Sequence, residues 1–231
     1  MLDFEDKVVL VTGAGKGIGR SIAQAFGLNG AFVAVNDITP VNLEGTLAGI
    51  SDGAQYTAQP RAQEYIYDIA NRMHVRSMVD QILTDRGHID TLVNCAFVEP
   101  QTSIMEMDEW DWRRTLDVNL GGPFFTMQAV GQFMIEARHG VIINLIKGMK
   151  RNQEPHSRLT RVASQSGLIG LTLAAAREFE EHQIKVYGII LGQMDLLSPS
   201  SPGGVLVPLS PENGTPENVS QIILDLCRRD T

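Results

Sequence analysis

Short runs of apolar, β-branched residues recur along this 231-residue chain, and segments of helical periodicity separate them. Apolar runs without polar alternation are typical of strands buried on both faces, as in a parallel sheet covered by helices. Strands and helices that follow each other in turn predict right-handed βαβ units. We therefore predict an α/β fold, a three-layer, doubly wound parallel sheet of the Rossmann type. The six predicted strands are residues 8–11, 32–35, 65–67, 91–94, 141–146 and 185–190.

The chain is predicted to form a single Rossmann-type domain over residues 1–231, because its length and 43% hydrophobic content suit one sizeable core. One segment, residues 197–216, is rich in Pro, Gly and Ser. Such turn chemistry predicts a mobile loop, and the ThrProGlu sequence after it predicts the start of a C-terminal helix.

Charge and composition exclude several function classes. The chain carries 27 acidic and 19 basic residues, a net charge of −8, so it is expected to repel nucleic acid and anionic membranes. No apolar run approaches the ~18 residues of a membrane-spanning helix. The acidic N-terminal sequence MLDFEDK does not resemble a secretory signal, which favours a cytoplasmic protein. The two cysteines, Cys95 and Cys227, form neither a disulfide framework nor a metal-ligand pattern.

A glycine-rich turn follows the first predicted strand. Gly13, Gly17 and Gly19 in VTGAGKGIG lie directly before a helical segment. Glycines allow positive φ and let the backbone approach a pyrophosphate, while the helix N-terminus offers free N–H groups. The pattern indicates a nucleotide site, and the alternative is a glycine-rich turn without a ligand.

Asp37 ends the second predicted strand. A carboxylate in this place can accept both hydrogen bonds of an adenine ribose diol and would repel a 2′-phosphate, so NAD is favoured over NADP. Lys16, inside the glycine-rich turn, argues the other way, because a cation there could meet a 2′-phosphate. The alternative interpretation of Asp37 is an acidic turn residue.

From about Lys7 to Gly192, the chain resembles the short-chain dehydrogenase/reductase family. The motifs that carry the resemblance are VTGAGKGIG (11–19), IYDIAN (66–71), LVNCAF (92–97), DVNLGGPF (117–124), GVIINL (140–145) and ASQSGLIGLT (163–172). The resemblance implies a cofactor site, a proton-relay Asn at Asn119, and a homodimer or higher oligomer. The implied cofactor-binding residues are Gly13, Lys16, Gly17, Ile18, Gly19, Asp37, Asp68, Ile69, Asn94 and Ala96.

The catalytic positions of that family hold other residues here. The family uses a Tyr as acid/base, a Lys four residues later that lowers the Tyr pKa, and a Ser that polarises the substrate oxygen. The alignment places Arg161 at the Tyr position and Gln165 at the Lys position, while the Ser position falls on Lys147 or Gly148. Arginine does not release a proton at physiological pH, and glutamine carries no charge. No Tyr in the chain is followed by Lys four residues later.

Further departures concern the nicotinamide half of the implied site. Phe97 replaces a Gly beside the cofactor ribose, Leu191 replaces a Pro, and Leu196 replaces a Thr that bonds the carboxamide. The resemblance also implies a final strand after the last helix, and the sequence ends at Thr231 without one. A sheet of six strands is therefore expected.

The segment 147–161 carries five basic residues and one acidic residue. It is predicted at the carboxyl edge of the sheet, where it would attract an anionic small molecule or an acidic partner surface, or else form a solvated loop. His156 in this segment is a candidate replacement acid, with an exposed loop histidine as the alternative.

Three functional hypotheses remain open. The first is a protein that binds NAD(H) but has a degenerate, inactive or weakly active catalytic site. The second is an active NAD(H)-dependent oxidoreductase in which Lys147, His156 or solvent supplies the proton. The third is a protein-interaction module with an empty cleft, favoured by Phe97 and by the missing final strand.

Overall fold

The computed structural model describes residues 3–53, 61–149, 159–194, 205–210 and 214–230. Its strands form one parallel sheet in the order β3-β2-β1-β4-β5-β6-β7. Order reverses at β1, which pairs with β2 on one side and β4 on the other, as predicted for a doubly wound fold. The strands are β1 Val8–Thr12, β2 Phe32–Asp37, β3 Ala62–Ile66, β4 Thr91–Asn94, β5 Gly140–Met149, β6 Ile184–Met194 and β7 Leu206–Leu209.

The seventh strand corrects the prediction of six. β7 pairs in parallel with the end of β6, from Gly188 with Leu206 to Leu191 with Leu209. It lies inside residues 197–216, so the prediction of a loop throughout that segment was also wrong; residues 197–204 and 211–213 lie outside the described residues. The four apolar residues of β7 were not predicted as a strand because the sequence around them is rich in Pro, Gly and Ser. Pro208 is tolerated in this strand because β7 lies at the edge of the sheet.

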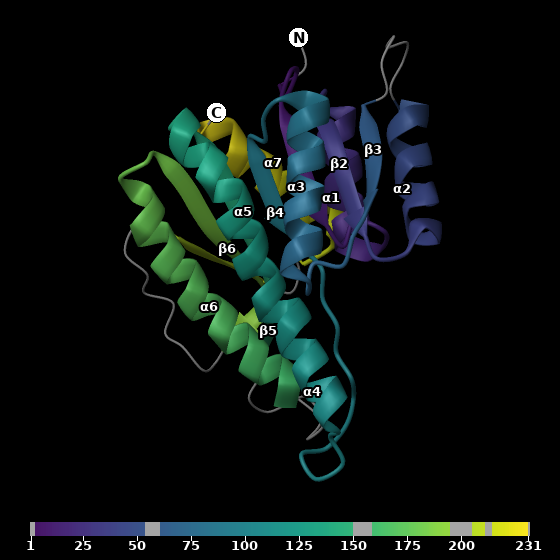
Figure 1. Cartoon of the computed structure of the whole chain (residues 1–231), viewed down its shortest axis with the longest axis vertical. Helices are drawn as coiled ribbons and strands as arrows, with labels where there is room; N and C mark the ends of the chain where they lie inside the picture. The colour runs from purple at the N-terminus through teal and green to yellow at the C-terminus, as the bar shows by residue number, and fades with distance from the viewer. Residues whose placement is uncertain (1–2, 54–60, 150–158, 195–204, 211–213, 231) are drawn as a thin grey trace.

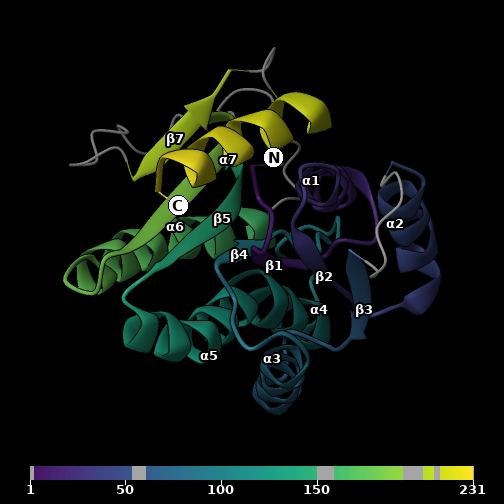
Figure 2. The same ribbon diagram turned by 90° about the horizontal axis from the view of Figure 1, so that it is seen from above.

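Helices cover both faces of the sheet (Figures 1 and 2). One core layer joins α1, α2 and α7 to the sheet through residues such as Phe26, Leu43 and Ile223. The opposite layer packs α3, α5 and α6 against it through Met78, Val130 and other apolar side chains. Within the described residues, every helix is too short or too polar to span a membrane. The helices are α1 Gly17–Leu28, α2 Pro40–Gly53, α3 Arg72–Arg86, α4 Glu109–Leu116, α5 Gly122–Ala137, α6 Leu159–Glu180 and α7 Pro216–Asp230, with a π-helix at Asp117–Gly121.

A buried amide network ties the middle of the sheet to α5 and α6. Asn94 Nδ2 donates to Asn144 Oδ1 at 2.9 Å, and Asn144 Nδ2 donates to Thr172 Oγ1 at 3.0 Å. Thr126 Oγ1 donates to Asn94 Oδ1 at 2.8 Å. All four side chains are buried. Because a buried amide without a partner is costly, these bonds fix how the helices sit on β4 and β5.

Replacing Asn144 with Ala leaves the Asn94 amide donor buried without its partner. We expect Asn144→Ala to lower the free energy of unfolding by about 2 kcal/mol, measured by urea denaturation followed by circular dichroism. The control is Gln221→Ala, which removes an exposed amide bonded to Asp225 and should change stability by less than about 0.5 kcal/mol. Equal effects of the two substitutions would contradict the assigned role of the network.

Candidate functional site

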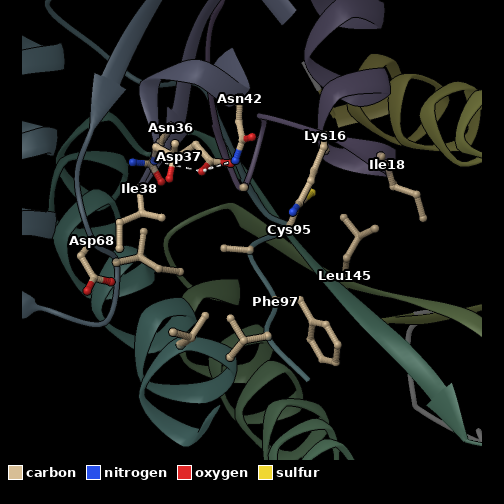
Figure 3. Close-up of a pocket in the computed structure, with 18 of the residues that line it drawn as sticks. Lys16, Ile18, Asn36, Asp37, Ile38, Asn42, Asp68, Cys95, Phe97 and Leu145 are labelled. Atoms are coloured by element: carbon tan, nitrogen blue, oxygen red, sulfur yellow. Dashed lines mark hydrogen bonds between the residues drawn. The ribbon is translucent and has the colours of Figure 1, made fainter. Parts of the chain in front are cut away.

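A cavity of about 520 Å³ opens at the carboxyl ends of the strands, where the strand order reverses. This is the place where open, doubly wound sheets bind ligands. Side chains from the glycine-rich turn, the ends of β2, β4 and β5, and helix α4 line it (Figure 3). The predicted cofactor-binding residues that line it are Gly13, Lys16, Gly17, Ile18, Gly19, Asp37, Asp68, Ile69 and Ala96.

The glycine-rich turn has the backbone that its sequence predicts. Gly13 and Gly17 have φ of +63° and +57°, a region that side chains other than Gly rarely adopt. A Cβ on Gly13 would lie 2.6 Å from the Cα of Ala96, so this glycine also allows the turn to approach the segment after β4. The N-cap of α1, Lys16, makes no side-chain capping bond. The first N–H groups of α1 are therefore available to an anion such as a pyrophosphate.

Asp37 is fixed at the end of β2. Its Oδ2 accepts the N–H of Gly15 at 3.2 Å, and its Oδ1 accepts the N–H of Thr39 at 3.2 Å and Nδ2 of Asn42 at 3.3 Å. Figure 3 shows the contact with Asn42 at the rim of the cavity. The carboxylate is thus held beside the glycine-rich turn, where it can accept hydrogen bonds from a ligand diol.

Asp68 is paired with a residue that the sequence did not predict. Arg114 from α4 donates from Nη1 to Asp68 Oδ2 at 2.8 Å and from Nη2 to Oδ1 at 3.2 Å. Burial raises the pKa of the Asp68 carboxyl, but the bonds from Arg114 and from the N–H of Ala70 outweigh it and lower that pKa below its ordinary value. Both partners line the cavity, next to Ile69. No local signal pointed to Arg114, because the contact joins residues 46 positions apart.

Two predicted residues do not line the cavity. Asn94 belongs to the buried network that joins β4 to β5. Asn119 is 1% exposed; its Oδ1 accepts the N–H of Val98 and its Nδ2 donates to the carbonyl of Val98, both at 2.9 Å. Nδ2 also lies 3.2 Å from Ser164 Oγ. Asn119 therefore fastens the segment after β4 to the π-helix and to α6.

Lys147, Arg161 and Gln165, which the sequence analysis aligned with the family's catalytic positions, are connected by short contacts. Gln165 Oε1 accepts the N–H of Lys147 at 2.7 Å. Lys147 Nζ lies 3.8 Å from the centroid of the Phe97 ring and 4.0 Å from Glu99 Oε2. Arg161 Nε lies 3.3 Å from Glu99 Oε1. Glu99 was not predicted, because its partners are remote in sequence. Lys147 and Phe97 line the cavity, whereas Arg161 and Gln165 do not.

Tyr65 and Tyr67 are engaged in hydrogen bonds to other side chains. Burial and a hydrogen bond to Asp85 raise the pKa of Tyr65, so its phenol stays protonated. Tyr67 lines the cavity but donates its hydroxyl to Gln81. Burial also raises the pKa of the Cys95 thiol, which is therefore neutral.

His156 and Leu196, and most of the basic segment 147–161, lie outside the described residues.

Metal binding has no support in the part of the chain that the structure describes. Its His, Cys, Asp and Glu side chains form no group of three or more that could hold a metal ion. The cavity thus offers N–H groups, carboxylates and apolar surface to an organic ligand.

Comparison with known proteins agrees with this geometry. The family model described as short chain dehydrogenase matches residues 7–198. The 3-oxoacyl-[acyl-carrier-protein] reductase FabG of Thermotoga maritima is 30% identical over 240 residues, covering 96% of this chain and 91% of the relative. A metagenomic short-chain oxidoreductase in complex with NADP has a TM-score of 0.82 at 25% identity, covering 98% and 92% of the two chains. NAD+-bound xylitol dehydrogenase has a TM-score of 0.74 at 29% identity, covering 82% and 71%.

The ion pair between Asp68 and Arg114 generates a prediction on pH. A carboxyl with a lowered pKa in the folded state stabilises the fold above its unfolded pKa, here 3.8, and loses that contribution as pH falls through the folded value. We expect Arg114→Met to cost about 1 kcal/mol at pH 7. The difference from the unsubstituted protein should shrink below about pH 3.8. Urea denaturation at a series of pH values measures this, and a difference independent of pH would contradict the assignment.

Proposed function

The chain belongs to the short-chain dehydrogenase family, and from this premise we propose that it binds NAD(H) in the cavity at the carboxyl edge of the sheet without the family's tyrosine-dependent proton transfer. The observation that carries the proposal is a contrast within one cavity. One end of the cavity, called the first end below, is lined by the glycine-rich turn, Asp37 and Asp68. The other end, called the second end below, has Phe97 where the resemblance implies a small Gly, and Lys147, on which the catalytic Ser position falls unless the gap places it on Gly148.

Support for dinucleotide binding comes from the first end. The α1 N-terminus supplies N–H groups and the positive end of its dipole to a pyrophosphate. Asp37 supplies acceptors for the hydroxyls of the adenine ribose and would repel a 2′-phosphate, which favours NAD over NADP. The structural relatives are divided, since the metagenomic oxidoreductase is in complex with NADP and xylitol dehydrogenase is bound to NAD+.

Support for weak or absent catalysis comes from the second end. A bound nicotinamide would supply a hydride, but reduction of a carbonyl also needs a proton donor near the substrate oxygen. An arginine side chain is not a proton donor at physiological pH, and a glutamine amide does not act as an acid in water, so neither Arg161 nor Gln165 supplies that proton. Gln165 instead anchors the backbone of Lys147, which is a structural task.

A second candidate function rests on Lys147. Its side chain is 44% exposed and lines the cavity, so its ammonium is the acid best placed among the described lining residues. An active reductase in which Lys147 gives up the proton is therefore the alternative, in line with the reductase activity named for FabG. Proton transfer from an ammonium with an ordinary pKa of about 10.4 would be slow at neutral pH.

Calorimetric titration with NADH, NAD, NADPH and NADP tests the binding proposal. We expect saturable binding of NAD(H), weaker binding of NADP(H), and a loss of about tenfold or more in NADH affinity on Asp37→Ala. The loss follows from removing the acceptors for the ribose diol. The matched control is Asp80→Ala, an exposed carboxylate on α3, which should leave the affinity unchanged. Absence of binding by all four would overturn the proposal and direct attention to the third hypothesis, a protein-interaction module.

Hydride transfer is tested on the same samples by following NADH absorbance with ketone and aldehyde substrates from about pH 6 to about pH 11. The proposal expects turnover that is absent or weak and that does not change in Lys147→Met. Turnover that is present below the pKa of an ammonium, is lost as pH rises through it, and disappears in Lys147→Met would support the second candidate instead.

We also propose that two copies of the chain associate through α5 and α6. A hollow of about 260 Å³ lies between these helices, lined by Phe124, Met127, Leu171, Ala175 and Phe179 among others. Phe124 remains 43% exposed in the single chain. Apolar side chains left at the surface favour a self-complementary interface.

The assembly proposal predicts the behaviour of Phe124→Glu. A buried carboxylate at a twofold interface has no partner, so the dimer should dissociate at concentrations where the unsubstituted protein stays dimeric. Sedimentation velocity measures the change. Met73→Glu, on an exposed side chain of α3, is the control and should leave the dimer intact. A monomeric unsubstituted protein would remove the proposal.

A further inference from the structure

We propose that the cavity recognises its ligand as an adenosine 5′-diphosphate, so that ADP and ADP-ribose bind as tightly as NADH, and that Phe97 sets this selectivity. The inference rests on the proposed function, because it concerns the ligand of the same cavity. It goes beyond the proposed function by assigning most of the binding free energy to the adenosine diphosphate half of the dinucleotide. The nicotinamide riboside half then contributes little to the affinity, because the protein does not recognise it.

Each part of an adenosine diphosphate meets a suitable group in the cavity. Ile38 and Ile69 offer apolar surface to a base, and the Asp68 carboxylate beside them can accept from its amino group. Asp37 lines the cavity and could accept hydrogen bonds from a ribose diol. The N-terminus of α1, with Lys16 at its N-cap, lines it as well and could bind two phosphates. These groups come from the ends of β1, β2 and β3 and are held by bonds within the protein.

The other end of the cavity is poor in hydrogen-bonding groups. Val98 lines it, but both its N–H and its carbonyl are bonded to Asn119. Lys147 lines it as well; its backbone N–H is bonded to Gln165, and its ammonium, which lies against the Phe97 ring, is a hydrogen-bond donor but not an acceptor. The remaining described lining there is largely apolar and includes Leu145 and Leu191. A nicotinamide carboxamide has two donor hydrogens and an acceptor oxygen, and its ribose has a diol; burying these without partners loses binding free energy.

Phe97 adds bulk at the same end. Figure 3 shows its ring on the opposite side of the cavity from Asp68, and Leu145 also lines the cavity. The Lys147 ammonium lies 3.8 Å from the ring centroid, a cation–π contact that holds both side chains in place. Arg161 and Gln165, which the sequence analysis aligned with the family's Tyr and Lys positions, do not line the cavity. The ring and the ammonium thus occupy the end of the cavity that a nicotinamide would enter.

Calorimetric titration of the full chain with ADP, ADP-ribose and NADH tests the inference. In the unsubstituted protein, we expect the dissociation constants of ADP-ribose and NADH to agree within about threefold. In Phe97→Ala, NADH should bind about tenfold more tightly, while ADP affinity stays the same, because only the nicotinamide half gains space. Phe133→Ala, which removes a half-exposed ring from α5 outside the cavity, should change none of the three.

The outcomes separate the inference from the proposed function. NADH binding about tenfold or more tightly than ADP-ribose to the unsubstituted protein overturns the inference and leaves the proposed function standing. The inference is likewise overturned if Phe97→Ala folds and leaves the ratio of NADH to ADP affinity unchanged. If none of the three ligands binds the unsubstituted protein, both the inference and the proposed function fail. If Phe97→Ala does not fold, the ratio of the ADP-ribose and NADH dissociation constants in the unsubstituted protein still tests the inference.

Discussion

The site depends on the parallel pairing of β1 with β2 on one side and β4 on the other. Strand order reverses there, so the connections leave toward opposite faces and open a crevice between them. The two walls must still approach closely, and Gly13 permits this because a Cβ in its place would meet the backbone of Ala96. From this constraint follow the position of the α1 N-terminus, the closeness of Asp37 to the glycine-rich turn, and the cavity itself.

Polar side chains near the cavity bond to other parts of the protein and fix the position of the segments that line the cavity. Asn119 bonds the backbone of Val98 through both sides of its amide, and Gln165 bonds the backbone of Lys147. Arg161, 6% exposed, forms an ion pair with Glu99. These bonds compensate for burying polar side chains near the cavity, since a buried group without a partner is costly. Asn119, Gln165 and Arg161 are thus engaged within the protein, which is consistent with the proposal that this end of the cavity contributes little to the binding of a nicotinamide.

Local patterns in the sequence predicted the parallel sheet, the glycine-rich turn and the place of Asp37, because each depends on neighbouring residues. Interactions between distant residues were missed. The Asp68 partner Arg114 and the Lys147 partner Glu99 come from other elements, and nothing near them in the chain indicates the pairing. β7 escaped prediction because its four residues lie within a Pro- and Gly-rich segment, and only pairing with β6 identifies them as a strand. Asn94 was assigned to the ligand, whereas its amide is bonded to neighbours across the sheet.

The proposed loss of catalytic groups and the proposed nucleotide site are physically compatible, because different elements of the fold build the two ends of the cavity. Asp37 ends β2 and Lys147 lies on β5, and β1 and β4 separate these strands in the sheet. At about 4.8 Å between neighbouring strands, three steps correspond to roughly 14 Å. Substitutions at such separations are usually additive, unless they share a partner. The groups that hold Asp37 come from the glycine-rich turn and α2, while those around Lys147 come from α6 and the segment after β4. Because different elements hold the two residues, changes around Lys147 need not disturb the surroundings of Asp37.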